Sequence, residues 1–453
     1  MRLNRIGVMG LLLACSTSVQ AEDLLDSWRA ARAHDAYFAA ARDAWSAGME
    51  QASQGDAGVL PVVSLDGFAR HLEKDYHSGR ESTSSKNSLG RQYSAGVSVV
   101  APIYNRAAFV TRDQSYRQAE QALLRYLAAE QDLILRTAKA YFDVLIAQES
   151  VNLVKAQSDA VGQQLAQAQK MFEIGLSSVT DRDDAQARFD TVVAAGIAAR
   201  NDLEVRANAY RTLTRLDPAR VRSFAPAVSE TATSPDALAA LLSQARVGNL
   251  AVQAQQLGAE IARLEIDRFR LESSPVLSLV ASAGRQFDHG SISASGGRDR
   301  TLNGVVGLQL SIPLYTGGGR QSRLRQAHAS ADQQANLLEA LQRDSEQQAH
   351  QYFLDMVNGS ARVRALEQAR ASALTSVASS KLGRQLGVRT VIEVLNAEQA
   401  YYQTLFNLVV SRYGVLFSKL QLAAATGTLR ESELAGVNAW LTGPAAASLP
   451  PTP

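Results

Sequence analysis

The stretch YSAGVSVVAPIYN, residues 93–105, decides the fold, because a similar stretch, NGVVGLQLSIPLYT, occupies residues 303–316. Apolar residues and small polar residues alternate along both copies until a proline, which is typical of a strand that ends at that proline. Pro102 and Pro313 differ by 211 positions. The two copies therefore mark equivalent strand ends in two halves of one chain.

Further landmarks indicate a tandem duplication. The pairs Tyr141-Phe142 and Tyr352-Phe353 also differ by 211 positions, and the later Gly175 and Gly387 differ by 212. Such near-constant spacing is expected when each half contains helices of equal length. We predict a first repeat at residues 22–216, a connector at 217–235, a second repeat at 236–428 and a C-terminal tail at 429–453.

Each repeat is expected to contain a helix, a β-hairpin and a long helical hairpin, in that order. The predicted ranges are one helix from 22 to about 55, hairpins at 59–104 and 105–216, one helix at 236–272, and hairpins at 274–316 and 320–425. The helix that starts near Arg106 and ends near Phe172 would be roughly 100 Å long at about 1.5 Å per residue. Such a helix is far longer than an ordinary domain is wide.

The first 21 residues, MRLNRIGVMGLLLACSTSVQA, are expected to be an export signal that is cleaved after Ala21. Two arginines, a short apolar run and a small-residue ending support this reading. The alternative is a lipoprotein signal, in which Cys15 at the end of LLAC would be acylated. No later stretch has eighteen uninterrupted apolar residues, so we expect no hydrophobic membrane-spanning helix.

Removal of that signal also limits the possible chemistry. Cys15 is the only cysteine, so the mature chain has no disulfide, thiolate metal site or cysteine nucleophile. Loss of Arg2 and Arg5 lowers the 46 basic residues to 44, which equals the 44 acidic residues, so the formal charge falls from +2 to zero. This balance gives no indication of nucleic-acid binding.

The four predicted strands each combine an apolar face with a face of small and polar residues. This is the alternation expected for strands with lipid on one side and water on the other. Four strands are too few to close a barrel, and open strand edges are costly in lipid because their peptide groups lack hydrogen-bond partners. A membrane barrel would therefore need several copies of the chain. The alternative is a soluble sheet that packs on the chain's own helices.

The chain resembles the TolC family of outer-membrane channel proteins over essentially all of its mature sequence. The resemblance rests on the strand-to-helix junctions APIYN (101–105) and IPLYTGG (312–318), and on the helix turns GLSSVTD (175–181) and GVRTVIEVLNAEQ (387–399). It implies an α+β membrane protein with an internal duplication. Three chains would share one outer-membrane β-barrel of four strands per chain, continued by an α-helical barrel across the periplasm of a Gram-negative bacterium.

The resemblance also implies a closed gate at the periplasmic ends of the helices. It assigns Asp181, Arg389, Glu393, Asn396 and Arg384 to this gate, with Asp181 as a candidate acceptor for Arg389 and Glu393 in an acidic ring on the pore axis. Asn396 replaces a second acid of that ring, and Arg384 or its neighbour replaces a tyrosine. The alternative is that Asp181 caps a helix and Glu393 is an ordinary exposed residue. The turn residues expected to contact an adaptor are Gly175, Leu176, Ser177, Gly387 and Val388.

Three functions fit these patterns. The first is the exit duct of a type I protein secretion system, with a periplasmic adaptor and an inner-membrane transporter, preferably an ABC transporter that supplies the energy. The second is the outer-membrane component of a multidrug efflux pump, and the third is a periplasmic coiled-coil scaffold that transports nothing. No enzyme motif or cofactor site is recognised. A metal site at His71 and His77 is disfavoured, because no third ligand is fixed by regular structure.

Overall fold

The computed structural model describes residues 23–76, 86–221, 235–293 and 297–442. The predicted export signal and the Pro- and Ala-rich end of the predicted tail lie outside these residues. The first half of the chain contains α1 (Leu24–His34), α2 (Ala36–Ala57), β1 (Val62–Tyr76), β2 (Lys86–Tyr104), α3 (Arg106–Glu173), α4 (Val179–Thr214) and a 3-10 turn, η1 (Pro218–Arg220). The second half contains α5 (Pro235–Gly248), α6 (Leu250–Leu271), β3 (Val276–Gly290), β4 (Arg298–Ser311), α7 (Gly319–Gln385), α8 (Val391–Ala425) and α9 (Glu431–Thr442).

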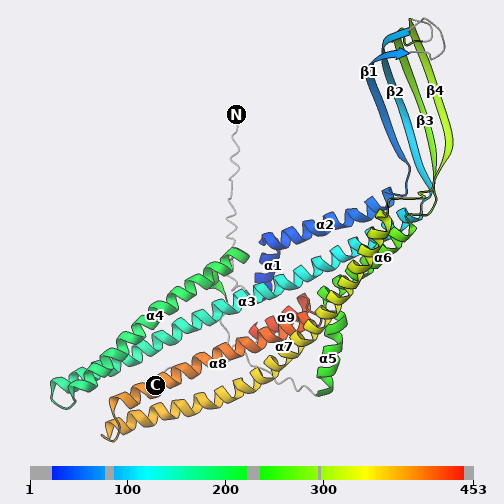
Figure 1. Ribbon diagram of the computed structural model, residues 1–453. Coiled ribbons are helices and arrows are strands. Elements are labelled where there is room, and N and C mark those ends of the chain that lie inside the picture. The colour runs from blue at the N-terminus through cyan, green and yellow to red at the C-terminus, as the bar shows by residue number, and fades with distance from the viewer. Residues whose placement is uncertain (1–22, 77–85, 222–234, 294–296, 443–453) are drawn as a thin grey trace, which may run out of the picture.

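The two halves repeat one another in space (Figure 1). Each begins with two short helices, continues into two strands, and ends in a hairpin of one very long helix and one shorter helix. The helical hairpins extend in one direction, whereas the four strands project from the other end of the molecule (Figure 1). This arrangement confirms the predicted internal duplication and fold class.

Each predicted opening helix is broken into two, which corrects the sequence analysis. Asp35 ends α1 and caps α2, because its carboxylate accepts a hydrogen bond from the Phe38 backbone N–H at 3.0 Å. In the second repeat, Asn249 caps α6 and accepts from the Ala251 N–H at 2.9 Å. Aspartate and asparagine compete well for backbone donors at helix starts, so each creates a new N-terminus inside a periodic pattern.

The four strands form one antiparallel sheet in the order β1-β2-β3-β4. The register aligns Leu65 with Val97, and Ala281 with Val306, so apolar side chains share one face. Leu65 and Val306 are each 79% exposed in the single chain. A face of this size and exposure needs lipid or protein to cover it. Because β1 and β4 are long, open edges, this sheet also needs strands from other chains.

The opposite face of the sheet is polar and carries its own hydrogen bonds. The Ser98 hydroxyl donates to the Asp66 carboxylate at 2.8 Å and lies 2.7 Å from the Ser64 hydroxyl. Ser282 lies opposite Ser98 on the next strand and extends this polar strip. The two faces thus have the chemistry of a lipid-facing surface and a water-facing surface.

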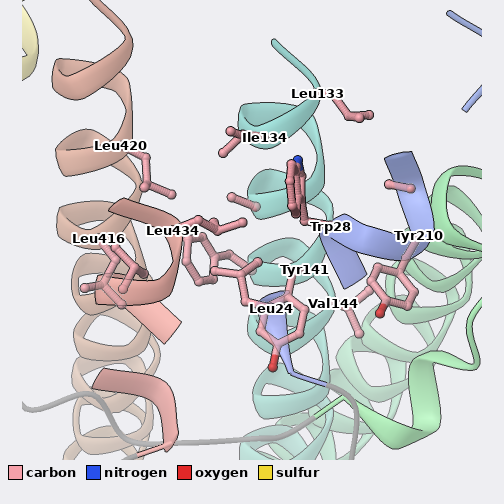
Figure 2. Packing of buried hydrophobic residues seen from close by; sticks show 14 of the residues in the cluster. Leu24, Trp28, Leu133, Ile134, Tyr141, Val144, Tyr210, Leu416, Leu420 and Leu434 are labelled. Carbon is pink, nitrogen blue, oxygen red and sulfur yellow. The ribbon is translucent and has the colours of Figure 1, made fainter. Parts of the chain in front are cut away.

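The largest core lies where the helices of both halves meet (Figure 2). Tyr141, one of the landmarks of the duplication, is fully buried there. Its ring meets the Tyr210 ring edge to face, with centroids 6.5 Å apart. The equivalent residue pair in the second half, Tyr352-Phe353, lies in the second core against α5 and α8. The repeated aromatic pair therefore anchors the same helix in both repeats.

The segment predicted as a C-terminal tail contains a helix, α9. Leu434 and Val437 on this helix are fully buried in the largest core. The Asn438 amide donates to the Asp23 carboxylate at 2.8 Å, and its oxygen accepts from the Leu24 N–H at 3.1 Å. This helix thereby packs on the start of α1, more than 400 residues earlier in the chain.

Within the described part of the chain, no helix has the length and apolar character needed to cross a membrane.

Candidate gate at the helical hairpin tips

The turns that end the two helical hairpins have the same construction. Gly175 and Gly387 adopt the left-handed conformation, with φ values of 76° and 74°. Only glycine takes this conformation without steric cost, and it closes the last turn of the preceding helix. Space around both residues is open. The preference for glycine at these two positions therefore comes from the backbone conformation rather than from contact with neighbouring atoms.

Both returning helices begin with a reciprocal capping box. At the start of α4, the Asp181 N–H donates to the Ser178 hydroxyl at 3.1 Å, and the Asp181 carboxylate accepts from the Ser178 N–H at 3.4 Å. At the start of α8, the Glu393 carboxylate accepts from the Thr390 N–H at 2.7 Å. Asp181 and Glu393 thus occupy equivalent positions, three residues after the cap.

These hydrogen bonds favour the ionised carboxylates. The Ser177 hydroxyl, which donates at 2.9 Å, is the main cause that lowers the pKa of Asp181. The pKa of Glu393 is lowered chiefly by the backbone N–H of Thr390. Both groups are therefore negatively charged at neutral pH, close to the positive ends of their helices.

Arg384 connects the second hairpin to the first. Its guanidinium, on α7, donates to the side-chain oxygen of Gln164 on α3. Burial lowers the pKa of Arg384, and the charges of Asp181 and Glu398 oppose that effect. Because arginine stays protonated even when its pKa falls, Arg384 supplies a fixed positive charge between the hairpins.

Arg389 and Asn396 have different partners. The Arg389 guanidinium donates to the Ser380 hydroxyl at 3.2 Å and lies 4.0 Å from a Glu393 oxygen. The Asn396 side-chain oxygen accepts from the Arg188 guanidinium on α4 at 2.9 Å, which joins the two hairpins. The pairing of Arg389 with Asp181 stays a prediction; in the single chain the cation that attracts Asp181 is Arg384.

An ion pair close to this site was missed in the sequence analysis. Glu398 on α8 is 2% exposed, and the Lys381 ammonium on α7 lies 3.2 Å from one of its oxygens. Apart from this ion pair, neither carboxylate oxygen has a hydrogen-bond donor among the described residues. Burial, followed by the Glu398 charge, raises the pKa of Tyr402 to about 12. Glu398 follows Val391, Val394 and Leu395 at helical spacing, a pattern that predicts burial.

The predicted adaptor-contact residues lie at the extreme ends of the hairpins. Leu176 is 72% exposed and Val388 is 76% exposed, whereas the Ser177 hydroxyl is engaged with Asp181. With Gly175 and Gly387, they form two similar exposed apolar tips. Such tips can make contact with another protein at low cost, because few polar groups must be desolvated.

A sequence model of the outer membrane efflux protein family matches residues 28–216 and again residues 241–428. Outer membrane protein TolC of Vibrio cholerae is 33% identical over 445 residues, covering 96% of this chain and 97% of the relative. The proteases secretion protein PrtF of Dickeya chrysanthemi is 28% identical, covering 97% and 96%.

Solved structures agree with the observed fold. The outer membrane protein VceC of Vibrio cholerae superposes with a TM-score of 0.72, covering 89% of this chain and 96% of that structure. The sequence identity of this pair is 20%, so the similarity concerns the fold.

Proposed function

Because the chain belongs to the outer membrane efflux protein family and is an outer-membrane channel, we propose that it serves as the exit duct of a type I protein secretion system. The observation that supports a duct is the sheet itself. One of its faces is apolar, the other is polar, and both of its edges are open. Three chains close these edges into one barrel, and the helical hairpins continue the passage into the periplasm. A periplasmic scaffold would expose this apolar face to water, which is unfavourable.

The energy for export comes from other components in this proposal. A periplasmic adaptor binds the exposed hairpin tips, and an inner-membrane ABC transporter drives the cargo. The repeated tips support this role, because Leu176 and Val388 present the same apolar surface twice in each chain. Six similar contacts per trimer would allow one ring of adaptors to bind.

The choice of protein secretion over drug efflux rests on the similarity to PrtF, a relative that is named for protease secretion. A deletion strain complemented with this chain separates the two functions. Loss of a secreted protein from the medium, restored by the chain, would support secretion. Unchanged secretion with increased sensitivity to several unrelated drugs would instead favour the efflux pump.

We assign the gate to Asp181, Arg384, Arg389, Glu393 and Asn396. These groups lie at the ends of the hairpins, and two of them already hold one hairpin to the other. In a trimer, three Glu393 carboxylates near the axis would attract cations and repel anions. The capping contacts do not exclude this role, because a carboxylate accepts several hydrogen bonds and keeps its charge.

Single-channel recordings test this assignment. Arg389→Ala and Asp181→Ala should each raise the conductance, because each removes one partner of the proposed contact between Arg389 and Asp181, which would restrain the closed tips. Arg270→Ala on α6 is a matched control, since Arg270 forms an ordinary surface pair with Asp267 at 3.5 Å. Conductance that is unchanged in both tip variants would contradict the proposed contact between Arg389 and Asp181.

A further inference from the structure

The outward, apolar face of the sheet changes character near the hairpin ends farthest from the helices. Here the register places exposed arginines on neighbouring strands: Arg91 on β2, Arg285 on β3, and Arg298 and Arg300 on β4. His71 and His289 share a cross-strand row with Arg91 and Arg298. We call these six residues the basic belt. Its composition is unexpected on a face that is otherwise mostly apolar and aromatic.

At the level of the basic belt, the aspartates of β3 and β4 lie on the inward face of the sheet, whereas the belt arginines lie on the outward face. Asp288 on β3 lies opposite Asp299 on β4 in the strand register, in a row that points to the polar, inward face. The Gln92 and Gln286 side chains both donate to Asp288 there. On the outward face, Glu73 is the single acidic residue among the strand side chains that the structure describes. Among these described side chains, the basic groups of the belt therefore outnumber the carboxylates on the same face.

The depth of the belt follows from the strand geometry. Tyr93 and Phe287 form an aromatic row just below the row of His71 and Arg91. Ten residues separate Leu277 from Phe287, about 34 Å along a strand at ~3.4 Å per residue. With a strand tilt of about 45°, this corresponds to an apolar band of roughly 24 Å, close to the ~25 Å of outer-membrane barrels. The aromatic row thus lies at the outer boundary of the hydrocarbon region.

This places the basic belt among the lipid headgroups of the outer leaflet. Arg300, whose guanidinium lies 5.7 Å from the centre of the Phe287 ring, is at the level of the aromatic row. Arg285 is one row lower, and its long side chain can extend its charge to the headgroups. Arginine binds phosphate through two parallel hydrogen bonds, and clusters of basic residues at a membrane surface select anionic lipids.

We propose that the basic belt is a binding site for the phosphate groups of the phosphorylated glycolipid, lipid A, that forms the outer leaflet. A phospholipid of the inner leaflet does not reach the belt, because the helices mark the periplasmic side and the belt lies at the opposite end of the strands (Figure 1). Each chain supplies one site, so the trimer carries three around its barrel. The inference depends on the outer-membrane location and not on the identity of the cargo.

The test is a titration of the purified trimer in detergent with diphosphoryl lipid A, followed by native mass spectrometry. The triple variant Arg91→Gln, Arg298→Gln and Arg300→Gln should bind at least tenfold more weakly. Arg70→Gln is the matched control, because Arg70 lies at the same level on the inward face and donates to Gln92. It should keep the affinity of the unmodified protein within twofold.

A second comparison needs no variant and holds even if the triple variant fails to assemble. The unmodified trimer should bind monophosphoryl lipid A and phosphatidylglycerol each at least fivefold more weakly than diphosphoryl lipid A. Equal binding of the two forms of lipid A would overturn the role of the phosphates. Equal binding of phosphatidylglycerol would overturn the choice of glycolipid, and an unaffected triple variant would overturn the site.

Discussion

At the scale of single residues, each hairpin tip places a carboxylate at a helix start, and we propose that the same carboxylate belongs to the gate. The sequence offered a choice for Asp181 between a gate residue and a helix cap. The structure shows the local contacts of Asp181 and Glu393, which are those of two equivalent capping boxes. The family resemblance singled out both residues in the sequence. Their observed partners, Ser177, Ser178 and Thr390, are local, whereas the partners of Arg384 and Asn396 depend on how the hairpins pack.

The capping contact of Asp181 predicts a stability that depends on pH. Its folded pKa lies below the ordinary value of 3.8, so its contribution is fully present above that pH and is lost as the pH falls through the folded pKa. Asp181→Asn should therefore lower stability at pH 7 by about 0.3–1 kcal/mol per chain, the typical contribution of a carboxylate near the start of a helix. Thermal unfolding of the trimer at pH 7 and at pH 3 measures this difference. A deficit of the same size at both values would show that the charge plays no part.

The buried pair of Glu398 and Lys381 leads to a second prediction. Lys381→Met removes the ion-pair partner of the buried Glu398 carboxylate, which should cost about 1–3 kcal/mol. This cost is smaller than the cost of breaking a fully buried pair, because the Lys381 side chain is 38% exposed and water already screens its charge. The double variant Lys381→Met and Glu398→Leu should recover most of the loss, since no buried charge remains.

Chemical denaturation of the four proteins of this double-mutant cycle provides the measurement. If the double variant is as unstable as the sum of the single variants, the two side chains are not coupled. The sequence contained the signal for this pair in the apolar spacing along α8. Glu398 is easily read as an exposed residue, because glutamate is rarely buried.

At the scale of elements, sequence patterns within one segment were informative and long-range packing was not. The alternation along the strands assigned the two faces of the sheet, and the repeated landmarks related the two halves. The breaks at Asp35 and Asn249 were missed, because each lies within a continuous helical pattern. Helix α9 was missed because its burial depends on α1, at the other end of the sequence.

Truncation tests the importance of α9. A chain that ends at Thr428 loses Leu434 and Val437, which are fully buried. Full burial of such side chains contributes about 1.5–3 kcal/mol each, so the loss should be roughly 3–6 kcal/mol. A chain that ends at Thr442 keeps the helix and serves as the control, and it should unfold at the same temperature as the full chain. Equal stability of both truncated chains would contradict the packing of α9 on α1.

At the scale of the whole molecule, the single chain has surfaces and strand edges that need other chains or lipid to cover them. Its sheet has two open edges and an apolar face without a cover, and its two helical hairpins form only part of a tube. Association of three chains in the outer membrane pairs the strand edges, places the apolar face against lipid and completes the tube. In the proposed gate, the charged groups at the tips then lie where the passage is narrowest.

Single-channel conductance of the detergent-extracted oligomer, with its mass determined on the same sample, tests this arrangement most directly. We predict a trimer with a small conductance that favours cations, because the proposed gate closes the tips and places carboxylates there. A monomer that stays soluble without detergent and is silent in lipid bilayers would contradict it.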